Sequence, residues 1–264
     1  MLRARALVMV SAAVLAVALV AGCGGGGSSQ PGSPTVAPGS AGTLTVSAAA
    51  SLTDVFNQLE KQFEAANPGV TVKLNYGASS DLAQQIVNGA PVDVFAAANT
   101  ATMDTVSKAG LVAGQPQVFV TNKLEIAVAP GNPKHVTSFA DLTKPGLKLV
   151  VCAPQVPCGS AEKQIEKDTG TTLKPVSEEP DVRSVLSKVS TGDADAGLVY
   201  VTDVKSTAGK VTGIDFPQAD QAINDYPIAV LKNASKPDLA AKWVELVRGP
   251  DGHQVLQAAG FGTP

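Results

Sequence analysis

Three serines in this chain stand where a strand-like segment gives way to a helix, an arrangement that suits the binding of an anion. Ser51 follows the strand-like run 43–50, and Ser79 and Ser160 each follow a turn made of small residues. The first turn of a helix carries N–H groups without intrahelical partners and a partial positive charge, both of which attract an anion. A serine at such a place more often only caps the helix, and we expect Ser51 to do so, with Asp54 as its capping-box partner.

Two further features extend this pattern. A fourth helix begins near Val182, and Tyr200 lies at the end of the predicted strand 196–201. In open α/β sheets, ligands gather outside the carboxyl ends of the strands. If these turns converge there, they surround one small object with N–H and O–H donors and little formal positive charge. The pattern therefore favours a pocket for an oxyanion.

The elements that must position these donors alternate between strand and helix. Short apolar runs predict strands at 43–50, 70–76, 91–98, 124–128 within the stretch 119–130, 147–152, 196–201 and 226–231. Apolar residues at helical spacing predict helices at 52–65, 81–86, 100–109, 139–142, 160–165, 182–189, 236–247 and 251–259. This alternation is typical of an α/β fold in which helices cover both faces of a sheet.

The N-terminal residues have the pattern of an export signal. Arg3 and Arg5 precede the apolar run 6–21, which is shorter than the roughly 20 residues that a membrane-spanning helix needs. Residues 1–22 are therefore predicted to be a signal peptide. The run ends in Val-Ala-Gly-Cys23, which resembles the lipobox of bacterial lipoproteins, so we expect a lipidated Cys23. The Gly/Ser/Pro-rich stretch 23–42 is predicted to be a flexible tether.

Composition and motifs argue against two other classes of protein. The chain of 264 residues has a formal charge of −3 and no basic tract, so we do not expect it to bind nucleic acid. The tetrad that begins at Ser160 fits the S-x-x-K pattern of some serine hydrolases, but no partner K-T-G follows it. The two histidines, His135 and His253, lie in no cluster that predicts a catalytic triad or a metal site. An enzyme is therefore the less favoured interpretation.

Seven segments together resemble one family. They are AAASLTDVFNQLEKQF, YGASSDLAQQI, GAPVDVFAAAN, VPCGSAEKQI, PDVRSVLSKV, AGLVYVTD and YPIAV, and they run in order over nearly all of residues 43–264. This part of the chain is similar to the molybdate-binding lipoproteins of ATP-driven importers, in the type II periplasmic binding-protein superfamily. The resemblance implies a two-lobed α/β fold, each lobe a mixed sheet flanked by helices, with the ligand in the cleft between them. Lobe I would comprise 43–124 and 225–264, and lobe II 125–224.

The resemblance also implies which residues hold the oxyanion. Ser51 and Ser79 match family serines that give a hydroxyl and a backbone N–H. Cys158 stands where the family commonly has Ala and would give a backbone N–H, as would Val182. The side chain of Val182 is expected in the core. Tyr200 would give its phenol O–H.

Two residues near these positions need separate expectations. With Cys23 lipidated, Cys152 and Cys158 remain as an even pair in an oxidising compartment, so we predict a disulfide between them that stiffens the donor loop. Arg183 could bind an anion directly, but a salt bridge on the surface or between the lobes is the favoured role.

The implied function is the capture of molybdate, and also of tungstate, without a cofactor. A tetrahedral dianion without protons requires only donors, whereas phosphate carries a proton and would want an acceptor. Sulfate differs mainly in size, so a site for sulfate or another tetrahedral oxyanion stays open as the alternative. The resemblance further implies a monomer that closes by a hinge motion and delivers its ligand to a membrane permease and its ATPase. It would work at the outer face of the bacterial cell membrane, anchored through Cys23.

Overall fold

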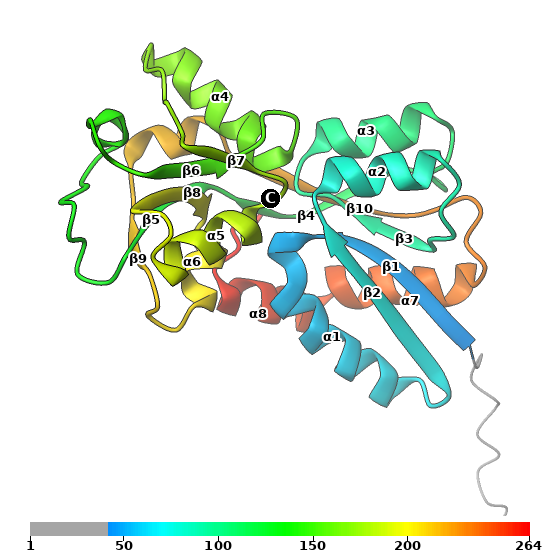
Figure 1. Ribbon diagram of the computed structural model, residues 1–264. Coiled ribbons are helices and arrows are strands. Elements are labelled where there is room, and N and C mark those ends of the chain that lie inside the picture. Colours follow the sequence, from blue (N-terminus) through cyan, green and yellow to red (C-terminus); the bar gives the residue numbers. More distant parts are fainter. Residues whose placement is uncertain (1–41) are drawn as a thin grey trace, which may run out of the picture. The chain divides into compact units, whose positions relative to one another are not determined.

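The computed structural model describes residues 42–264 (Figure 1). The predicted signal peptide, Cys23 and nearly all of the predicted tether lie outside the described residues. Within residues 42–264, no helix combines the length and the hydrophobicity that crossing a membrane requires.

The first of two mixed sheets is built from both ends of the described chain. Its strand order is β2-β1-β3-β10-β4. β1 runs parallel to β2 and β3, and β10 runs antiparallel to β3 and β4. The strands are β1 (Gly42–Ala49), β2 (Val70–Gly77), β3 (Val94–Ala96), β4 (Gln117–Asn122) and β10 (Asn224–Val230). The accompanying helices are η1 (Ala50–Leu52), α1 (Thr53–Ala66), α2 (Ser79–Val87), α3 (Thr100–Lys108), α7 (Pro237–Arg248) and α8 (Pro250–Ala259).

The second sheet is formed by the middle of the chain, in the order β7-β6-β8-β5-β9. β6 is parallel to β7 and β8, and β5 is antiparallel to β8 and β9. The strands are β5 (Leu124–Val128), β6 (Leu149–Cys152), β7 (Ser177–Glu179), β8 (Ala196–Tyr200) and β9 (Thr212–Ile214). The helices are η2 (Ala140–Thr143), α4 (Pro157–Thr169), α5 (Val182–Thr191), α6 (Val201–Ser206) and η3 (Pro217–Gln221). Two mixed sheets flanked by helices confirm the predicted fold class.

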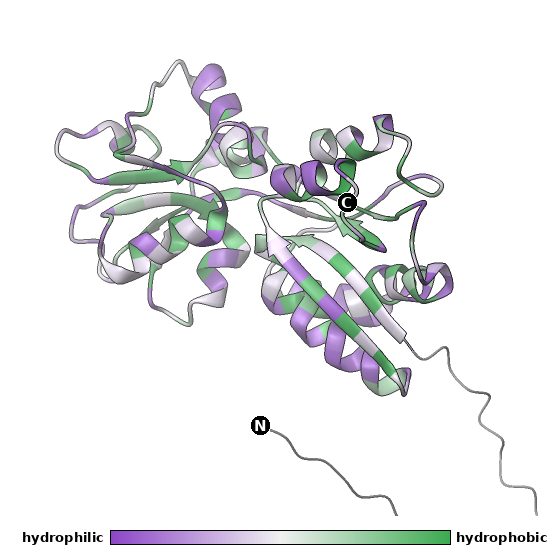
Figure 2. Cartoon of the chain, turned by 45° about the vertical axis from the view of Figure 1, so that its right-hand side comes forward, coloured by the Kyte–Doolittle hydropathy of each residue, from purple (hydrophilic) through white to green (hydrophobic). Residues whose placement is uncertain are grey.

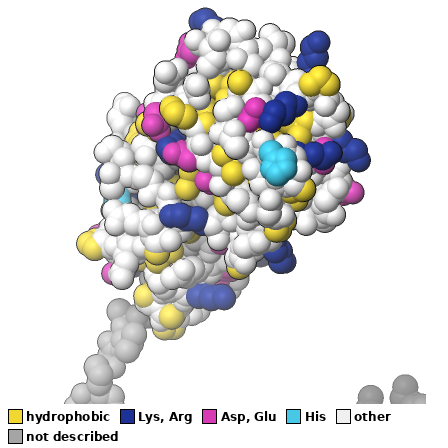
Figure 3. All heavy atoms as spheres, turned by 90° about the vertical axis from the view of Figure 1, so that its left-hand side faces the viewer, with side chains coloured by type: hydrophobic (Ala, Val, Ile, Leu, Met, Phe, Trp, Pro, Cys, Tyr) yellow, Lys and Arg dark blue, Asp and Glu magenta, His cyan; other side chains and the backbone are white. Residues whose placement is uncertain are grey.

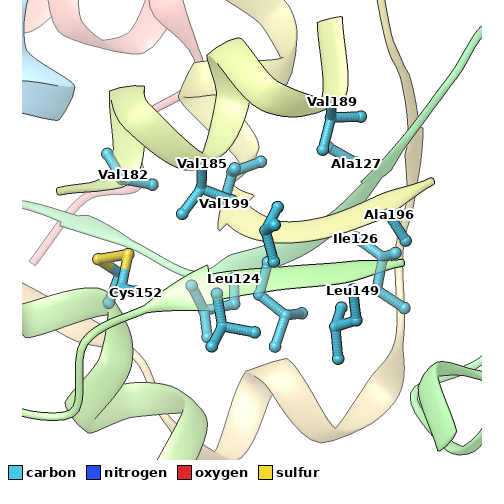
Figure 4. Close-up of a cluster of buried hydrophobic side chains, with 14 of the residues drawn as sticks. Leu124, Ile126, Ala127, Leu149, Cys152, Val182, Val185, Val189, Ala196 and Val199 are labelled. Carbon is cyan, nitrogen blue, oxygen red and sulfur yellow. A yellow bond between two sulfur atoms is a disulfide. The ribbon is translucent and has the colours of Figure 1, made fainter. Parts of the chain in front are cut away.

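Each sheet has its own hydrophobic core. In the first, Phe56 of α1 packs between Phe119 and Trp243, with ring centroids 6.3 and 5.6 Å away. In the second, Val185 and Val189 of α5 point down onto the strands (Figure 4). Hydropathy colouring shows the same division, since helices mix hydrophilic and hydrophobic residues while the inner strands are largely hydrophobic (Figure 2). On the face drawn in Figure 3, Lys and Arg side chains are interspersed with acidic ones, with no single continuous basic patch.

The chain passes between the two sheets at two places that lie together. The first is Lys123, between β4 and β5, and the second is the segment 222–223, before β10. Asn122 and Asn224 are paired in the antiparallel ladder of β4 and β10, so the two crossings are hydrogen-bonded neighbours. Lys123 is held by Asp215 and Asp220 at 3.1 and 2.9 Å.

Several element boundaries differ from the predicted ones. The strand predicted at 124–128 is β5, but the stretch 119–130 also holds the end of β4, a strand of the first sheet that was not predicted separately, because the chain crosses at Lys123. α4 begins at Pro157 rather than at Ser160, with the proline in the first turn, where its missing N–H is tolerated. The short elements β7, β9 and α6 were not predicted, since runs of three to six residues carry little periodicity.

Candidate functional site

A small cavity lies between elements of the two sheets. Its volume is about 20 Å³, against roughly 300–1,000 Å³ for typical small-molecule pockets, so in this conformation it suits a very small occupant. All five residues predicted to hold the ligand line it. The lining consists of Ala49, Ala50, Ser51, Gly77, Ala78, Ser79, Ala98, Val156, Pro157, Cys158, Asp181, Val182 and Tyr200. Most of these are small residues, which bring backbone amides close to the cavity.

Ser79 is the first residue of α2 and is almost completely buried. Its hydroxyl oxygen accepts a hydrogen bond of 2.9 Å from the backbone N–H of Ala98. Ala98 is itself held, because the side-chain amide of Asn224 donates to its carbonyl at 2.7 Å. With its acceptor role occupied by a backbone donor, the Ser79 hydroxyl keeps its proton for a partner in the cavity.

Ser51 does not cap a helix, so the predicted capping box with Asp54 is wrong. A 3-10 turn, η1, precedes α1, the cap position falls on Leu52, and no side chain caps it. The Ser51 hydroxyl instead lies 2.9 Å from the phenol oxygen of Tyr226, a residue 175 positions away. Ser51 is therefore held by a long-range contact rather than by its own helix.

The first turn of α4 presents backbone donors to the cavity. Pro157 has no N–H, so Cys158 supplies the first amide of the helix, and no side chain caps this turn. A disulfide joins Cys152 to Cys158, as predicted, and ties the turn to the end of β6. Gly159 allows the close approach, since a Cβ there would lie 2.1 Å from the carbonyl oxygen of Ala153.

The first turn of α5 adds another donor from the second sheet. Asp181 caps this helix by accepting from the N–H of Ser184 at 2.9 Å, which leaves the N–H of Val182 without an intrahelical partner. The side chain of Val182 is buried in the second core, as expected, and Figure 4 shows it beside the disulfide of Cys152. Asp181 also lines the cavity, which the sequence did not anticipate.

Tyr200 closes the cavity at the end of β8. Its ring is buried against that of Tyr226, with centroids 6.0 Å apart. Its phenol oxygen is buried and has no hydrogen-bond partner among the described residues. Burial raises the pKa of Tyr200 well above its usual value, so the phenol stays protonated and can donate a hydrogen bond to a ligand in the cavity.

Charged side chains lie around the cavity, but among the described residues none of those that line it is positively charged. Within the described part of the chain, the lining contains no Lys, Arg or His. Arg183 pairs with Asp54 of α1 at 2.6 Å and with Asp203 of α6 at 3.1 Å, so it forms the predicted salt bridge between elements of the two sheets. Burial raises the pKa of Asp203 to about 6, and the Arg183 guanidinium opposes that rise.

The alternative motifs gain no support from the structure. Ser160 is exposed on α4, and Lys163 of the same helix pairs with Glu162 and Glu166 at 3.4 and 2.8 Å. Among residues 42–264, no group of three His, Cys, Asp or Glu side chains could hold a metal ion. The donors around the cavity fit an anion rather than a cation.

Glu162 is a buried acid behind the donor turn of α4 and sets a pH dependence of stability. Burial raises its pKa from 4.5 to about 7, with Lys163 opposing the rise. The folded state therefore binds this proton more tightly than the unfolded state, and stability falls as pH rises from about 4.5 to about 7. We expect Glu162→Gln to raise the free energy of unfolding by about 2 kcal/mol at about pH 8 and to leave it unchanged below about pH 4.

Urea unfolding of the two proteins at both pH values checks this expectation. Glu245→Gln, which changes an exposed acid on α7, is the matched control and should show no such difference. A Glu162→Gln variant less stable than the wild type at about pH 8 would contradict the assignment.

This fold and this cavity define a class of extracellular binding protein, and the comparison with known proteins agrees. The chain belongs to the family of bacterial extracellular solute-binding proteins, which matches residues 44–262. It is 51% identical to the molybdate-binding protein ModA of Mycobacterium tuberculosis H37Rv, over 97% of this chain and 98% of that one. The resemblance found in the sequence is thereby confirmed, as is the interpretation as a binding protein rather than an enzyme.

Two solved structures share the fold. The periplasmic molybdate-binding protein of Azotobacter vinelandii matches with a TM-score of 0.74 and 24% identity, over 84% of this chain and 99% of that one. The sulfate-binding protein SubI of Mycobacterium tuberculosis H37Rv matches with a TM-score of 0.72 and 18% identity, over 83% and 86%. Since proteins named for two different oxyanions have this fold, the fold alone does not select the anion.

Proposed function

We propose that this protein captures molybdate outside the cytoplasm and delivers it to an ATP-driven importer in the membrane. The observation that carries the proposal is the 51% identity, over nearly the full length of both chains, to a protein named for molybdate binding. The cavity supports it, because hydroxyls and first-turn amides from both sheets meet there without a cation. Tungstate, which has nearly the same size and charge, is proposed as a second ligand.

The proposed ligand contacts are the hydroxyls and backbone N–H groups of Ser51 and Ser79, the hydroxyl of Tyr200, and the backbone N–H groups of Cys158 and Val182. Each hydrogen bond to a charged group is worth about 1.5–3 kcal/mol. Several of them, less the costs of dehydration and of ordering, reach the roughly −8 to −12 kcal/mol of micromolar to nanomolar binding. A site without Arg or Lys is therefore sufficient for a dianion.

Closure by a hinge is proposed as the capture step. The two lobes would be residues 43–124 with 225–264, and residues 125–224. Two observations support this division. Within the described residues, the polypeptide chain passes between the sheets only at the paired crossings near Lys123 and Asn224. The cavity is lined by residues from both sheets. The Arg183–Asp54 pair would form as the lobes close.

Anchoring and partners belong to the same proposal. The lipobox-like sequence before Cys23 supports a lipid anchor, and the stretch 23–42 would let a monomeric domain reach a permease and its ATPase. We expect the protein to partition into the detergent phase from cell membranes and Cys23→Ala to abolish this. Equal partitioning of both proteins would contradict the anchor.

Calorimetric titration of the purified protein with molybdate, tungstate, sulfate and phosphate tests the ligand. We expect tight binding of molybdate and tungstate, weaker binding of sulfate, and none of phosphate, whose proton would need an acceptor, since the carboxylate of Asp181 in the lining already accepts from the N–H of Ser184. If sulfate binds as tightly as molybdate, the proposal that molybdate is the specific ligand is wrong, but the proposal that the site binds a tetrahedral oxyanion stands.

A further inference from the structure

Tyr226 lies behind the cavity, on the strand by which the chain returns to the first sheet. Its side chain is fully buried, and it is not among the residues that line the cavity. Its phenol oxygen lies 2.9 Å from the hydroxyl oxygen of Ser51, which does line it. Its ring packs against Tyr200 of the second sheet and against Phe261. Tyr226 therefore touches one proposed ligand residue from each sheet without touching the ligand.

The direction of the Tyr226–Ser51 hydrogen bond decides what Ser51 offers to the cavity. Each hydroxyl has one proton. If Ser51 donates to Tyr226, its hydroxyl presents only lone pairs to the cavity, which repel an oxyanion. If Tyr226 donates to Ser51, the proton of Ser51 is free to point at the ligand.

The surroundings of Tyr226 favour the second direction. Burial raises the pKa of its phenol, so it keeps its proton and needs an acceptor. The backbone N–H of Lys123 donates to Oδ1 of Asn122, which turns the amide nitrogen of Asn122 to the other side, where it donates to Thr202 at 2.8 Å. Within residues 42–264 the phenol oxygen of Tyr226 is hydrogen-bonded to Ser51, whereas the neighbouring phenol oxygen of Tyr200 has no partner, so Ser51 accepts the phenol proton.

Ser79 shows the same arrangement by another route. Its oxygen accepts from the backbone N–H of Ala98 at 2.9 Å, so its own proton is also left for the cavity. Both serines of the first sheet thus have a protein donor on the side away from the ligand. In one case the donor is the backbone, and in the other it is Tyr226.

We propose that Tyr226 is a positioning residue that fixes Ser51 as a donor to the bound oxyanion and so disfavours anions that carry a proton. The inference rests on the proposed function. It predicts that Tyr226 acts on ligand affinity only through Ser51, which a general structural role would not do.

A double-mutant cycle measured by calorimetry with molybdate tests this. Tyr226→Phe is expected to weaken binding about tenfold, and Ser51→Ala about ten- to hundredfold. In the Ser51→Ala background, adding Tyr226→Phe should change the affinity by less than about twofold. The inference is overturned if Tyr226→Phe leaves the affinity unchanged in the wild-type background, or weakens binding as much without Ser51 as with it.

Tyr76→Phe is the matched control, since the phenol of Tyr76 bonds to Asn57 and to the carbonyl of Thr53, away from the cavity. It should leave the affinity unchanged. If Tyr226→Phe fails to fold, a difference of more than about twofold between Ser51→Ala and the double variant still overturns the inference, since the double variant leaves neither partner of this hydrogen bond unpaired and should fold. If the wild-type protein binds sulfate and not molybdate, the double-mutant cycle is measured with sulfate instead. If the wild-type protein binds neither anion, the proposed function itself is refuted.

Discussion

Replacing Tyr200 by Phe is expected to weaken molybdate binding about ten- to hundredfold and, at the same time, to stabilise the ligand-free protein. The loss of affinity follows from removing one hydrogen bond to a charged ligand, worth about 1.5–3 kcal/mol. The gain in stability follows from the ligand-free geometry, in which the buried phenol oxygen of Tyr200 has no partner. Removing a buried, unpaired polar group should raise the free energy of unfolding by about 1 kcal/mol.

Titration calorimetry and urea unfolding of the same variant measure the two effects. Tyr76→Phe is again the matched comparison and should give the reverse result, because its phenol has two partners and lies outside the cavity. It should lose stability and keep its affinity. A Tyr200→Phe variant that loses stability and retains affinity would remove Tyr200 from the site.

The sequence predicts the fold well where its periodicity is strong. Val182, Val185 and Val189 fall on one face of a helix, and that helix packs them against the second sheet (Figure 4). The change of sheet at Lys123 was implied only by the resemblance, which places the lobe boundary at residues 124–125, because the periodicity of the stretch 119–130 did not separate β4 from β5. Local sequence reports burial and extended backbone, but not which sheet a strand joins.

The candidate site, too, was predicted from the sequence only in part. Ser51, Ser79, Cys158, Val182 and Tyr200 were chosen from turns and from the resemblance, and the structure brings all five to one cavity. Tyr226 was missed as a partner of Ser51, since 175 residues separate them and neither residue signals the contact. The cap expected for Ser51 fails for a related reason: the 3-10 turn η1 moves the start of α1 beyond it.

The two sheets supply different kinds of hydrogen-bond donor to the cavity. The first sheet supplies hydroxyls whose orientation depends on other buried donors, as in Ser51 and Ser79. The second sheet supplies backbone amides at the starts of α4 and α5, whose direction is fixed by the helices themselves. Side-chain substitutions in the first sheet should therefore act through single hydrogen bonds. In the second sheet, apart from the phenol of Tyr200 at the end of β8, the donors are backbone groups, so only a change that moves the backbone should have a large effect on them.

Gly159→Ala is the substitution that should move that backbone. A Cβ at this position would lie 2.1 Å from the carbonyl oxygen of Ala153 and 2.8 Å from that of Cys152, and neither backbone group can rotate away as a side chain could. The first turn of α4 must then shift, and with it the N–H of Cys158, while the disulfide holds the turn close to β6. We expect molybdate affinity to fall at least about a hundredfold and the free energy of unfolding to fall by about 1–3 kcal/mol.

The matched control is Gly170→Ala, at the opposite end of the same helix. Gly170 has a φ of +67° and nothing within 4 Å of an added Cβ, so alanine there costs about 1 kcal/mol through backbone strain alone. It should lower stability and leave the affinity unchanged, as measured by urea unfolding and titration calorimetry. Because both variants are destabilised, a loss of binding confined to Gly159→Ala can be assigned to the displaced donor turn. Equal affinities in the two variants would show that the start of α4 does not hold the ligand.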